Sequence, residues 1–293
     1  MSLNFKGCVL TDVVTVIVSV FDNTVALERT LWGFAAQDCK EFRIILADDG
    51  SSKESVEHVR SFVGDLNLKV AHIWQENKGF RKARILNKAI NCAKTERLLF
   101  VDADVIPRSD FVSNHIRLLR PNYFISGGSH LNLPPELQAQ IQRSQIESGE
   151  LFTLDFLLQH DVDEKKFKLR LEKFGSKARL FDALFPRSNA FVGCNASCWK
   201  KDALAINGFN EDWGYGGTDV EFGKRLTNSG VKSRRHSFSL AILHQDHPRP
   251  YKDPEQVKRN KNTLKVLAKS GVTKVTQGVD KISDEEVAIL YDT

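Results

Sequence analysis

The chain has 293 residues, of which 41% are hydrophobic and 27% are charged, which is ordinary for a soluble globular protein and excludes a disordered chain. Its 42 basic and 37 acidic residues give a formal net charge of +5 without a long block of like charges, so we expect no nucleic-acid partner. The apolar runs are far shorter than the roughly 18 residues that span a bilayer, and the first residues lack a signal peptide, which predicts a cytoplasmic protein. Peripheral contact with the inner face of the membrane stays open.

Apolar, β-branched runs alternate with amphipathic stretches through the first half of the chain. This pattern predicts strands at 13–20, 42–50, 68–74 and 97–105, with helices at 24–37, 51–62 and 80–94 between them. Strands that alternate with helices of this length form right-handed crossovers in a parallel sheet. Ligands bind such sheets at the carboxyl ends of the strands, so residues at these ends are the first candidates for a site.

The composition changes in the second half of the chain. Residues 134–188 are charged, helix-prone and poor in β-branched residues, which predicts a helical excursion. Strand-like runs return at 189–199 and 237–243, with a helix at 217–229 between them, and the short basic run at 232–235 is interpreted as a solvated turn. We therefore expect one domain at 1–251, made of a first half at 1–130, the excursion and a second half at 189–251, followed by a helical tail at 252–293.

Two pairs of carboxylates stand at predicted strand ends. Asp102 and Asp104, in VDADVIP, are one residue apart, so both side chains can reach the same point. Like charges this close repel unless a cation or a proton relieves them, and Mn2+ or Mg2+ prefers carboxylate and phosphate oxygens. Asp48 and Asp49 end another strand, where an acidic group can accept hydrogen bonds from a nucleotide. Taken alone, each pair is also compatible with an acidic turn.

Basic and imidazole side chains near these strand ends are candidate partners for phosphates and a metal. Four basic residues between 78 and 84 flank Gly79, which permits a close backbone approach, so they can face phosphates or be plain solvated charges. His244 and His247 follow the strand predicted at 237–243. His244 is nearer the strand end, so we expect it rather than His247 to be a further metal ligand.

A glycine-rich loop in FNEDWGYGGTDVEFGKRL, residues 209–226, precedes the helix predicted at 217–229. Its Trp213 and Tyr215 are typical of rings that stack on sugars or bases, although the loop can equally fold onto its own aromatic side chains. Asp219 and Glu221 fall near the helix start, where the helix dipole keeps a carboxylate ionised. They either cap the helix or take part in chemistry.

In this order the motifs resemble the family 2 glycosyltransferases of the nucleotide-diphospho-sugar transferase, or GT-A, fold. The resemblance covers about residues 13–248 and rests on ADDGSS, NKGFRKARILNKAI, FVDADVIP, the segment from FVGCNASCW to GKRL, and LHQDHP. The later motifs are similar to those of bacterial chondroitin polymerase and animal β-1,4-galactosyltransferase domains. The resemblance implies an α/β GT-A fold with a central, mostly parallel sheet flanked by helices, with the donor bound by the first half.

The resemblance also implies roles for individual residues. Donor binding is assigned to Ser19, Asp48, Asp49, Asn77, Lys78, Gly79, Arg84, Asp102 and Ala103. The acceptor is assigned to Trp213, Tyr215, Gly216, Gly217 and Glu221, the metal to Asp104 and His244, and the catalytic base to Asp219. Two features depart from the family pattern: the first strand ends in SVFDN without a proline, and Thr218 replaces a glutamate that contacts the acceptor.

The implied reaction is inverting transfer of a sugar from a UDP-sugar to a hydroxyl of a saccharide or lipid-linked saccharide, with Mn2+ or Mg2+ as cofactor. A sugar nucleotidyltransferase shares the architecture, but it normally has a glycine-rich basic loop after the first strand, where this chain has SVFDNT. A non-catalytic nucleotide-sugar-binding module is the second alternative, and the intact set of carboxylates disfavours it.

Overall fold

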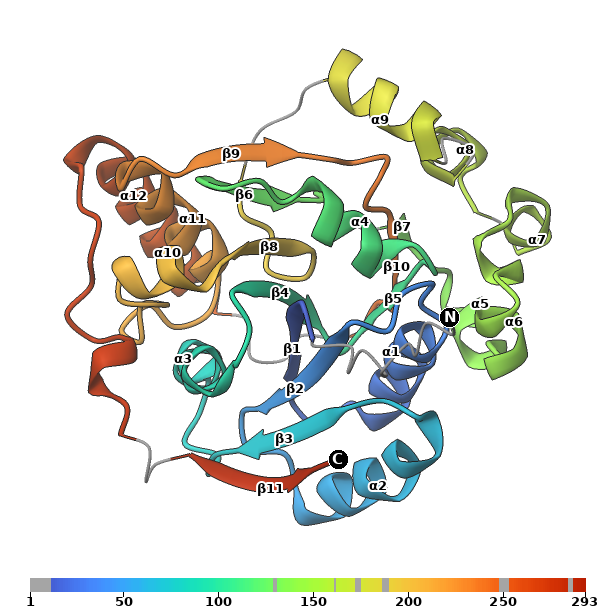
Figure 1. The fold of residues 1–293 in the computed structure, drawn as a ribbon, viewed down its shortest axis with the longest axis horizontal. Coiled ribbons are helices and arrows are strands. Elements are labelled where there is room, and N and C mark those ends of the chain that lie inside the picture. The colour runs from blue at the N-terminus through green and yellow to red at the C-terminus, as the bar shows by residue number, and fades with distance from the viewer. Residues whose placement is uncertain are drawn as a thin grey trace, which may run out of the picture.

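A central eight-stranded sheet organises the computed structural model of the protein, which describes residues 12–128, 131–160, 162–171, 175–185, 190–247, 253–283 and 287–293 (Figure 1). The strand order is β11-β3-β2-β1-β4-β8-β6-β9. The strands are β1 (Val14–Val20), β2 (Phe42–Asp48), β3 (Val70–Trp74), β4 (Arg97–Asp102), β6 (Tyr123–Ser126), β8 (Ala196–Trp199), β9 (Lys232–Arg235) and β11 (Ala288–Asp292). β8 and β11 run antiparallel to their neighbours and the remaining pairs are parallel, which confirms a mostly parallel sheet.

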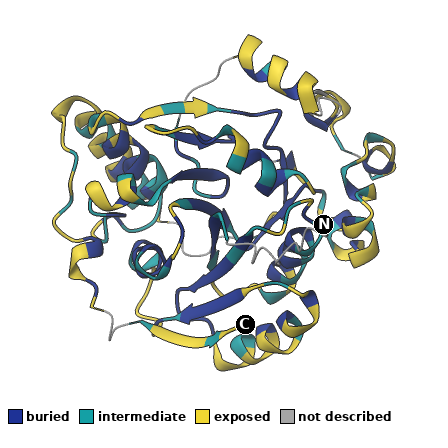
Figure 2. Cartoon of the chain, in the orientation of Figure 1, coloured by how far each residue is buried: buried dark blue, intermediate teal, exposed yellow. Residues whose placement is uncertain are grey.

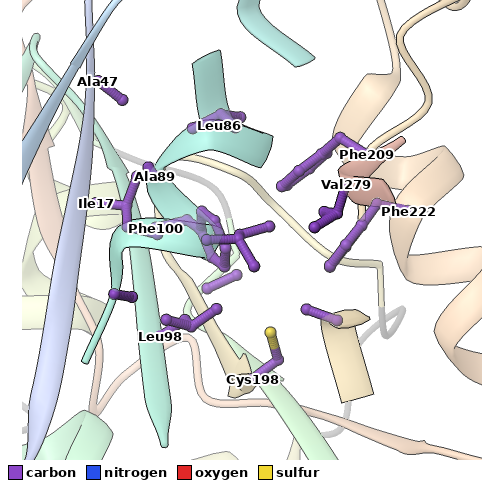
Figure 3. Packing of buried hydrophobic residues seen from close by; sticks show 14 of the residues in the cluster. Ile17, Ala47, Leu86, Ala89, Leu98, Phe100, Cys198, Phe209, Phe222 and Val279 are labelled. Atoms are coloured by element: carbon purple, nitrogen blue, oxygen red, sulfur yellow. The ribbon is translucent and has the colours of Figure 1, made fainter. Parts of the chain in front are cut away.

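Helices cover both faces of this sheet. One face carries α1 (Thr24–Ala35), α2 (Lys53–Val63) and α4 (Phe111–Leu118), and the other carries α3 (Lys82–Cys92), α10 (Lys200–Ala205) and α11 (Thr218–Asn228). β1 contributes to both layers, with Val16 and Val18 in the first and Ile17 in the second, because successive side chains of a strand point to opposite faces. Figure 3 shows the second layer, in which Phe209 and Phe222 stack with ring centroids 4.1 Å apart.

A small second sheet brings two segments of the site together. β10 (Ile242–His244) pairs antiparallel with β5 (Val105–Pro107) and parallel with β7 (Leu131–Asn132). In this register His244 lies opposite Val105, which places it beside Asp104. The strand predicted at 237–243 is correct only in its last residues, because residues 237–240 form a turn.

The middle of the chain is helical, as its composition predicts. It contains α5 (Pro135–Gln140), α6 (Arg143–Glu147), α7 (Leu154–Leu158), α8 (Glu164–Leu171) and α9 (Gly175–Leu184). These helices lie at the periphery, with much of their outer surface exposed, and build a separate apolar cluster around Leu151 and Leu157 (Figures 1 and 2). Short 3-10 helices occur at Gly64–Leu66, Glu150–Phe152 and Val279–Lys281. Within the described ranges, we find no helix long and apolar enough to cross a membrane.

Both edges of the sheet contain strands that the sequence did not predict. Residues 232–235 form β9, parallel to β6, so their interpretation as a solvated turn is wrong; main-chain pairing holds this segment despite its basic side chains. In the tail, α12 (Pro254–Ser270) confirms the expected helix, but residues 288–292 form β11 against β3. The expectations for residue 189 and for the start of the tail at 252 fall outside the described residues.

Candidate active site

A pocket of about 710 Å³ opens at the carboxyl ends of β1, β2 and β4. The strand register brings these ends together, because Ser19 pairs with Asp102 and Val20 pairs with Asp48. Nine residues predicted from the sequence line the pocket: Ser19, Asp49, Asn77, Gly79, Asp102, Ala103, Asp104, Tyr215 and His244. The pocket therefore occupies the ligand position expected for a parallel α/β sheet.

Asp102 is held by two neighbouring donors. Ser19 Oγ donates to Asp102 Oδ1 at 2.6 Å, and Lys82 Nζ donates to the same oxygen at 2.5 Å. Burial alone would lower the pKa of Lys82, but the Asp102 carboxylate outweighs burial and raises this pKa. Lys82 therefore keeps a fixed positive charge in the pocket, which suits an anionic group of a ligand.

Asp104 meets two imidazole rings. Its Oδ2 lies 2.9 Å from Nε2 of His247 and 3.3 Å from Nε2 of His244. Burial works to raise the pKa of Asp104, but hydrogen bonds with both histidines outweigh burial and hold the pKa below its usual range. Position in the chain favours His244 over His247, whereas the structure brings both rings to Asp104 and places His247 nearer.

The donor set around Asp104 has the chemistry of a divalent-metal site. A carboxylate with two imidazoles suits Mn2+, and no described residue hydrogen-bonds to the buried Asp104 Oδ1, so the residues present are chemically compatible with such an ion. Across the described ranges, however, no three His, Cys, Asp or Glu side chains are arranged as a formed metal site. Metal binding by Asp104 and His244 therefore stays a prediction.

The carboxylates of Asp48 and Asp49, in the acidic turn after β2, point in different directions. Asp48 is buried beneath the turn, where its Oδ1 accepts two main-chain N–H groups and its Oδ2 lies 2.9 Å from His72 Nε2. Asp49 lines the pocket, and its carboxylate accepts Gln75 Nε2 at 2.6 Å and the Arg81 N–H at 2.8 Å. Burial raises the pKa of Asp49, against the effect of these hydrogen bonds. Of the two, Asp49 is the one placed to meet a ligand.

Two basic residues assigned to the donor lie outside the pocket lining. Lys78 is exposed and pairs with Glu76 at 2.7 Å. Arg84 Nη1 pairs with Glu211 Oε2 at 2.7 Å, which ties α3 to the segment before α11. The cation that the structure does place in the pocket is Lys82, two positions before Arg84 and on a different side of α3.

Two residues assigned to the acceptor are packed in the interior. Trp213 is 6% exposed, and its indole N–H donates to Gly216 O at 3.0 Å, so it supports the loop from within. Glu221 is 2% exposed and forms a bidentate pair with buried Arg225 at 2.6 and 2.8 Å. Tyr215, in contrast, lines the pocket, where its ring packs edge-on against Phe80 at 5.3 Å.

Asp219 lies beside the pocket at the start of α11. Its Oδ2 accepts the Gly193 N–H at 2.9 Å, and the next residue, Cys194, lines the pocket. Burial raises the pKa of Asp219, two main-chain hydrogen bonds work against the rise, and the charges of Lys82 and Asp102 also act on it. A partly buried carboxylate with a raised pKa is suited to accept a proton near neutral pH.

Further residues line the pocket that the motifs do not assign to the donor, the acceptor or the metal. They are Val20, Phe21, Asp22, Asn23, Ala47, Phe80, Lys82, Ile85, Cys194 and His247. A signal was available for Asp22 and Asn23, which directly follow a predicted strand end, and for Lys82, which is one of the four basic residues near Gly79. The apolar lining residues carry no such signal.

The fold and the pocket define a GT-A glycosyltransferase, with acidic strand ends surrounding a site at the edge of a mostly parallel sheet. The chain belongs to glycosyl transferase family 2, whose model matches residues 15–169. A second model, described as the N-terminal domain of galactosyltransferase, matches residues 177–247. Both matches confirm the resemblance stated from the motifs, and both end before α12 and β11.

Curated relatives are similar at low identity. Chondroitin synthase of Escherichia coli is 27% identical over 240 residues, which are 78% of this chain and 34% of that protein. The uncharacterized glycosyltransferase YfnE of Bacillus subtilis is 24% identical over 274 residues, covering 84% of this chain and 68% of YfnE. Validoxylamine A glucosyltransferase of Streptomyces hygroscopicus subsp. jinggangensis is 25% identical, covering 79% and 56%. The chain thus spans about a third of the chondroitin synthase and about half of the glucosyltransferase.

Solved structures share the fold. S. aureus TarS 1-349 in complex with UDP-GlcNAc superposes with a TM-score of 0.56 at 16% identity, covering 87% of this chain and 66% of that one. The mannosyltransferase PcManGT from Pyrobaculum calidifontis, in complex with GDP-Man and Mn2+, gives a TM-score of 0.52 at 18% identity, covering 89% and 72%. At these identities the likeness concerns the fold, and the two structures carry donors with different bases.

Proposed function

We propose that the protein is an inverting, metal-dependent glycosyltransferase that moves a sugar from a UDP-sugar to a hydroxyl of a saccharide or lipid-linked saccharide. The observation that carries the proposal is the convergence of Asp49, Asp102 and Asp104 on one pocket, with Asp219 beside it. Residues 1–130 would bind the donor, and residues 189–251 would supply the base and meet the acceptor.

In this proposal the residues in and beside the pocket have different roles. Asp49, at the end of β2, accepts hydrogen bonds from the nucleoside, and Lys82 supplies positive charge toward the diphosphate. Asp219 removes the proton of the acceptor hydroxyl as its oxygen attacks the anomeric carbon, and one such displacement inverts that carbon. Asp104 and His244, with His247, would hold Mn2+ or Mg2+, which offsets the negative charge that grows on the departing diphosphate.

The acceptor is proposed to differ from that of the galactosyltransferase pattern at one contact. Thr218 stands in place of the glutamate, and its hydroxyl donates to Gly214 O at 3.0 Å within the loop. The name of the chondroitin synthase relative supports a saccharide acceptor. A cytoplasmic location with peripheral contact at the membrane fits a lipid-linked acceptor and forms part of the proposal.

Donor binding is tested with a panel of nucleotides and UDP-sugars, scored by UDP release and by melting temperature. UDP, and not GDP or CMP, should stabilise the protein, and only with Mn2+ or Mg2+ present. Ligand at 100-fold above its dissociation constant contributes about 2.7 kcal/mol. Equal shifts with and without EDTA would overturn the metal dependence, and a preference for GDP would overturn the donor assignment.

Asp219→Asn separates binding from chemistry. Asparagine keeps the shape of the side chain but cannot take a proton, so UDP-sugar binding should stay near normal while turnover falls by about 100-fold or more. The cap of α11 is Gly217, and Asp219 accepts the Gly193 and Val220 N–H groups, of which an asparagine keeps one, so a purely structural Asp219 would leave a less stable but active variant. An active Asp219→Asn enzyme would therefore refute the assignment of the base, and a protein that binds UDP-sugar but transfers nothing would be a binding module.

A further inference from the structure

The loop at 213–217, which leads into α11, has an unusual backbone. Gly214, Gly216 and Gly217 have φ angles of +66°, +95° and +87°, in the left-handed region that favours glycine. A loop in this conformation forms no regular ladder, so its carbonyl groups need partners from elsewhere in the protein. Gly216 O accepts the Trp213 indole and Gly214 O accepts the Thr218 hydroxyl, and the further partners come from α12.

The amide nitrogen of Asn260, in α12, faces three of these carbonyl groups. Its Nδ2 lies 2.8 Å from Gly216 O, 3.0 Å from Tyr215 O and 3.3 Å from Trp213 O, and the residue is 5% exposed. Gln256, one turn earlier, donates to Asn260 Oδ1 at 2.8 Å. This bond fixes the orientation of the Asn260 amide, because the oxygen faces Gln256 and the nitrogen faces the loop.

The glycines of the loop, which lack a Cβ atom, also allow it to pack closely against α12. A Cβ atom on Gly216 would lie 2.9 Å from Val257 Cγ2, and one on Gly217 would lie 3.4 Å from Leu264 Cδ1. At its far end α12 is tied to α11, because Asn228 Nδ2 donates to Leu267 O at 3.2 Å. α12 therefore supports both ends of the segment that contains Asp219.

We infer that Asn260 is a positioning residue that holds the 213–217 loop, and through it Tyr215 and Asp219, in the geometry required for sugar transfer. The inference rests on the proposed role of Asp219. Tyr215 lines the pocket against Phe80, and Asp219 is two residues after Gly217. Without the Asn260 amide, Trp213 O keeps Gln256 Nε2 and Gly216 O keeps the Trp213 indole, but Tyr215 O loses its bond from α12, so the loop that carries Tyr215 and leads to Asp219 should loosen. α12 lies outside both family-model matches, so this support is not part of the matched family pattern.

The test compares Asn260→Ala and Asn260→Asp with Asn262→Ala, an exposed asparagine about 200° round the same helix. Aspartate keeps the size of Asn260 and the bond from Gln256 but cannot donate, so it replaces the contacts with the loop carbonyls by repulsion between oxygens without leaving a void. Both Asn260 variants should speed hydrogen exchange in peptides covering 212–218, and Asn262→Ala should match the wild type. Transfer to the acceptor should fall roughly 10- to 100-fold in kcat, the effect of a small misplacement, with KM for the donor within about twofold.

Gln256→Ala gives a milder perturbation in case the Asn260 variants unfold. It removes the bond that orients the Asn260 amide and the contact of Gln256 Nε2 with Trp213 O at 3.3 Å, and it should give a smaller change of the same kind in both exchange and kcat. Unchanged hydrogen exchange in the loop, or an Asn260→Asp enzyme with the kcat of the wild type, would overturn the inference. Equal losses of donor binding and kcat that track the folded fraction would also overturn it. Hydrogen exchange needs no turnover, so the hold on the loop is measured even if the proposed sugar transfer proves wrong.

Discussion

His115 should make the protein sensitive to mild acid. The ring is buried in α4, with Nδ1 2.9 Å from Ser197 Oγ and Nε2 3.2 Å from Asn195 Oδ1. The Asn195 amide nitrogen donates to Leu240 O at 2.6 Å, so its oxygen faces the ring, which makes Nε2 the protonated nitrogen of a neutral imidazole. Burial lowers the pKa of His115 from 6.5 to about 3, against the effect of the Asn195 hydrogen bond.

The sign and size of the effect follow from this pKa. Between pH 6.5 and about 3 the unfolded chain binds a proton at His115 that the folded protein does not, so stability is complete above the unfolded pKa and is lost as the pH falls. The difference amounts to about 2 kcal/mol by pH 5 and approaches about 5 kcal/mol near pH 3. Urea unfolding of the wild type and of His115→Gln at about pH 7.5 and about pH 5 measures it.

The wild type should lose about 2 kcal/mol more than His115→Gln between these two pH values, because all other titrating groups are shared. His58→Gln, at an exposed position, is the matched control and should lose as much as the wild type. Equal losses in the wild type and in His115→Gln would refute the assignment of a buried, neutral imidazole.

Three further outcomes are expected at the site. The raised pKa of Asp219 should place the acid limb of kcat/KM above the usual range of an aspartate. Rates measured from about pH 3.5 to 8 would contradict this if the limb lay at an ordinary carboxylate value. Calorimetry should show that His244→Ala and His247→Ala each weaken Mn2+-dependent UDP binding by roughly 10-fold or more. If His247→Ala binds UDP as tightly as the wild type, His244 alone assists Asp104. Glu221→Gln should cost about 3 kcal/mol in urea unfolding because it leaves the Arg225 charge buried without its carboxylate, and a change in acceptor KM instead would return Glu221 to the acceptor site.

The sequence predicts β1 to β4 and the helices between them well because these strands are buried on both faces, but it does not predict β5, α4 or β6. The runs at 13–20 and 42–50 are continuous and apolar, and each ends in polar residues that belong to the pocket. β9 could not be predicted in this way, since KSRR has neither apolar residues nor alternation and its strand is held by main-chain bonds to β6. Edge strands need little burial, so hydrophobic patterns miss them.

Within the site, the sequence identifies which strand ends carry chemistry but not the direction of each side chain. Asp48 and Asp49 are neighbours in the chain, yet one supports the turn and the other faces the pocket. The register of the helix determines that Lys82, and not Arg84, faces the pocket. The burial of Trp213 determines that its ring supports the loop from within. These are properties of three-dimensional packing, which motifs at fixed spacing do not encode.

The position of β11 has a consequence for how the protein is made. β11 covers the open edge of β3, although the two strands are far apart in the sequence. Ala288 pairs with Trp74, Asp292 forms an ion pair with Arg43 at 2.5 Å, and the ring of Tyr291 packs against His72. During synthesis from the N-terminus, the edge of β3 is therefore exposed long after the β1–β4 part of the sheet has emerged, and an open edge is a template for pairing with other chains. His72 also supports Asp48 beneath the acidic turn, so the turn after β2 gains this last layer of packing only when residues 288–292 leave the ribosome.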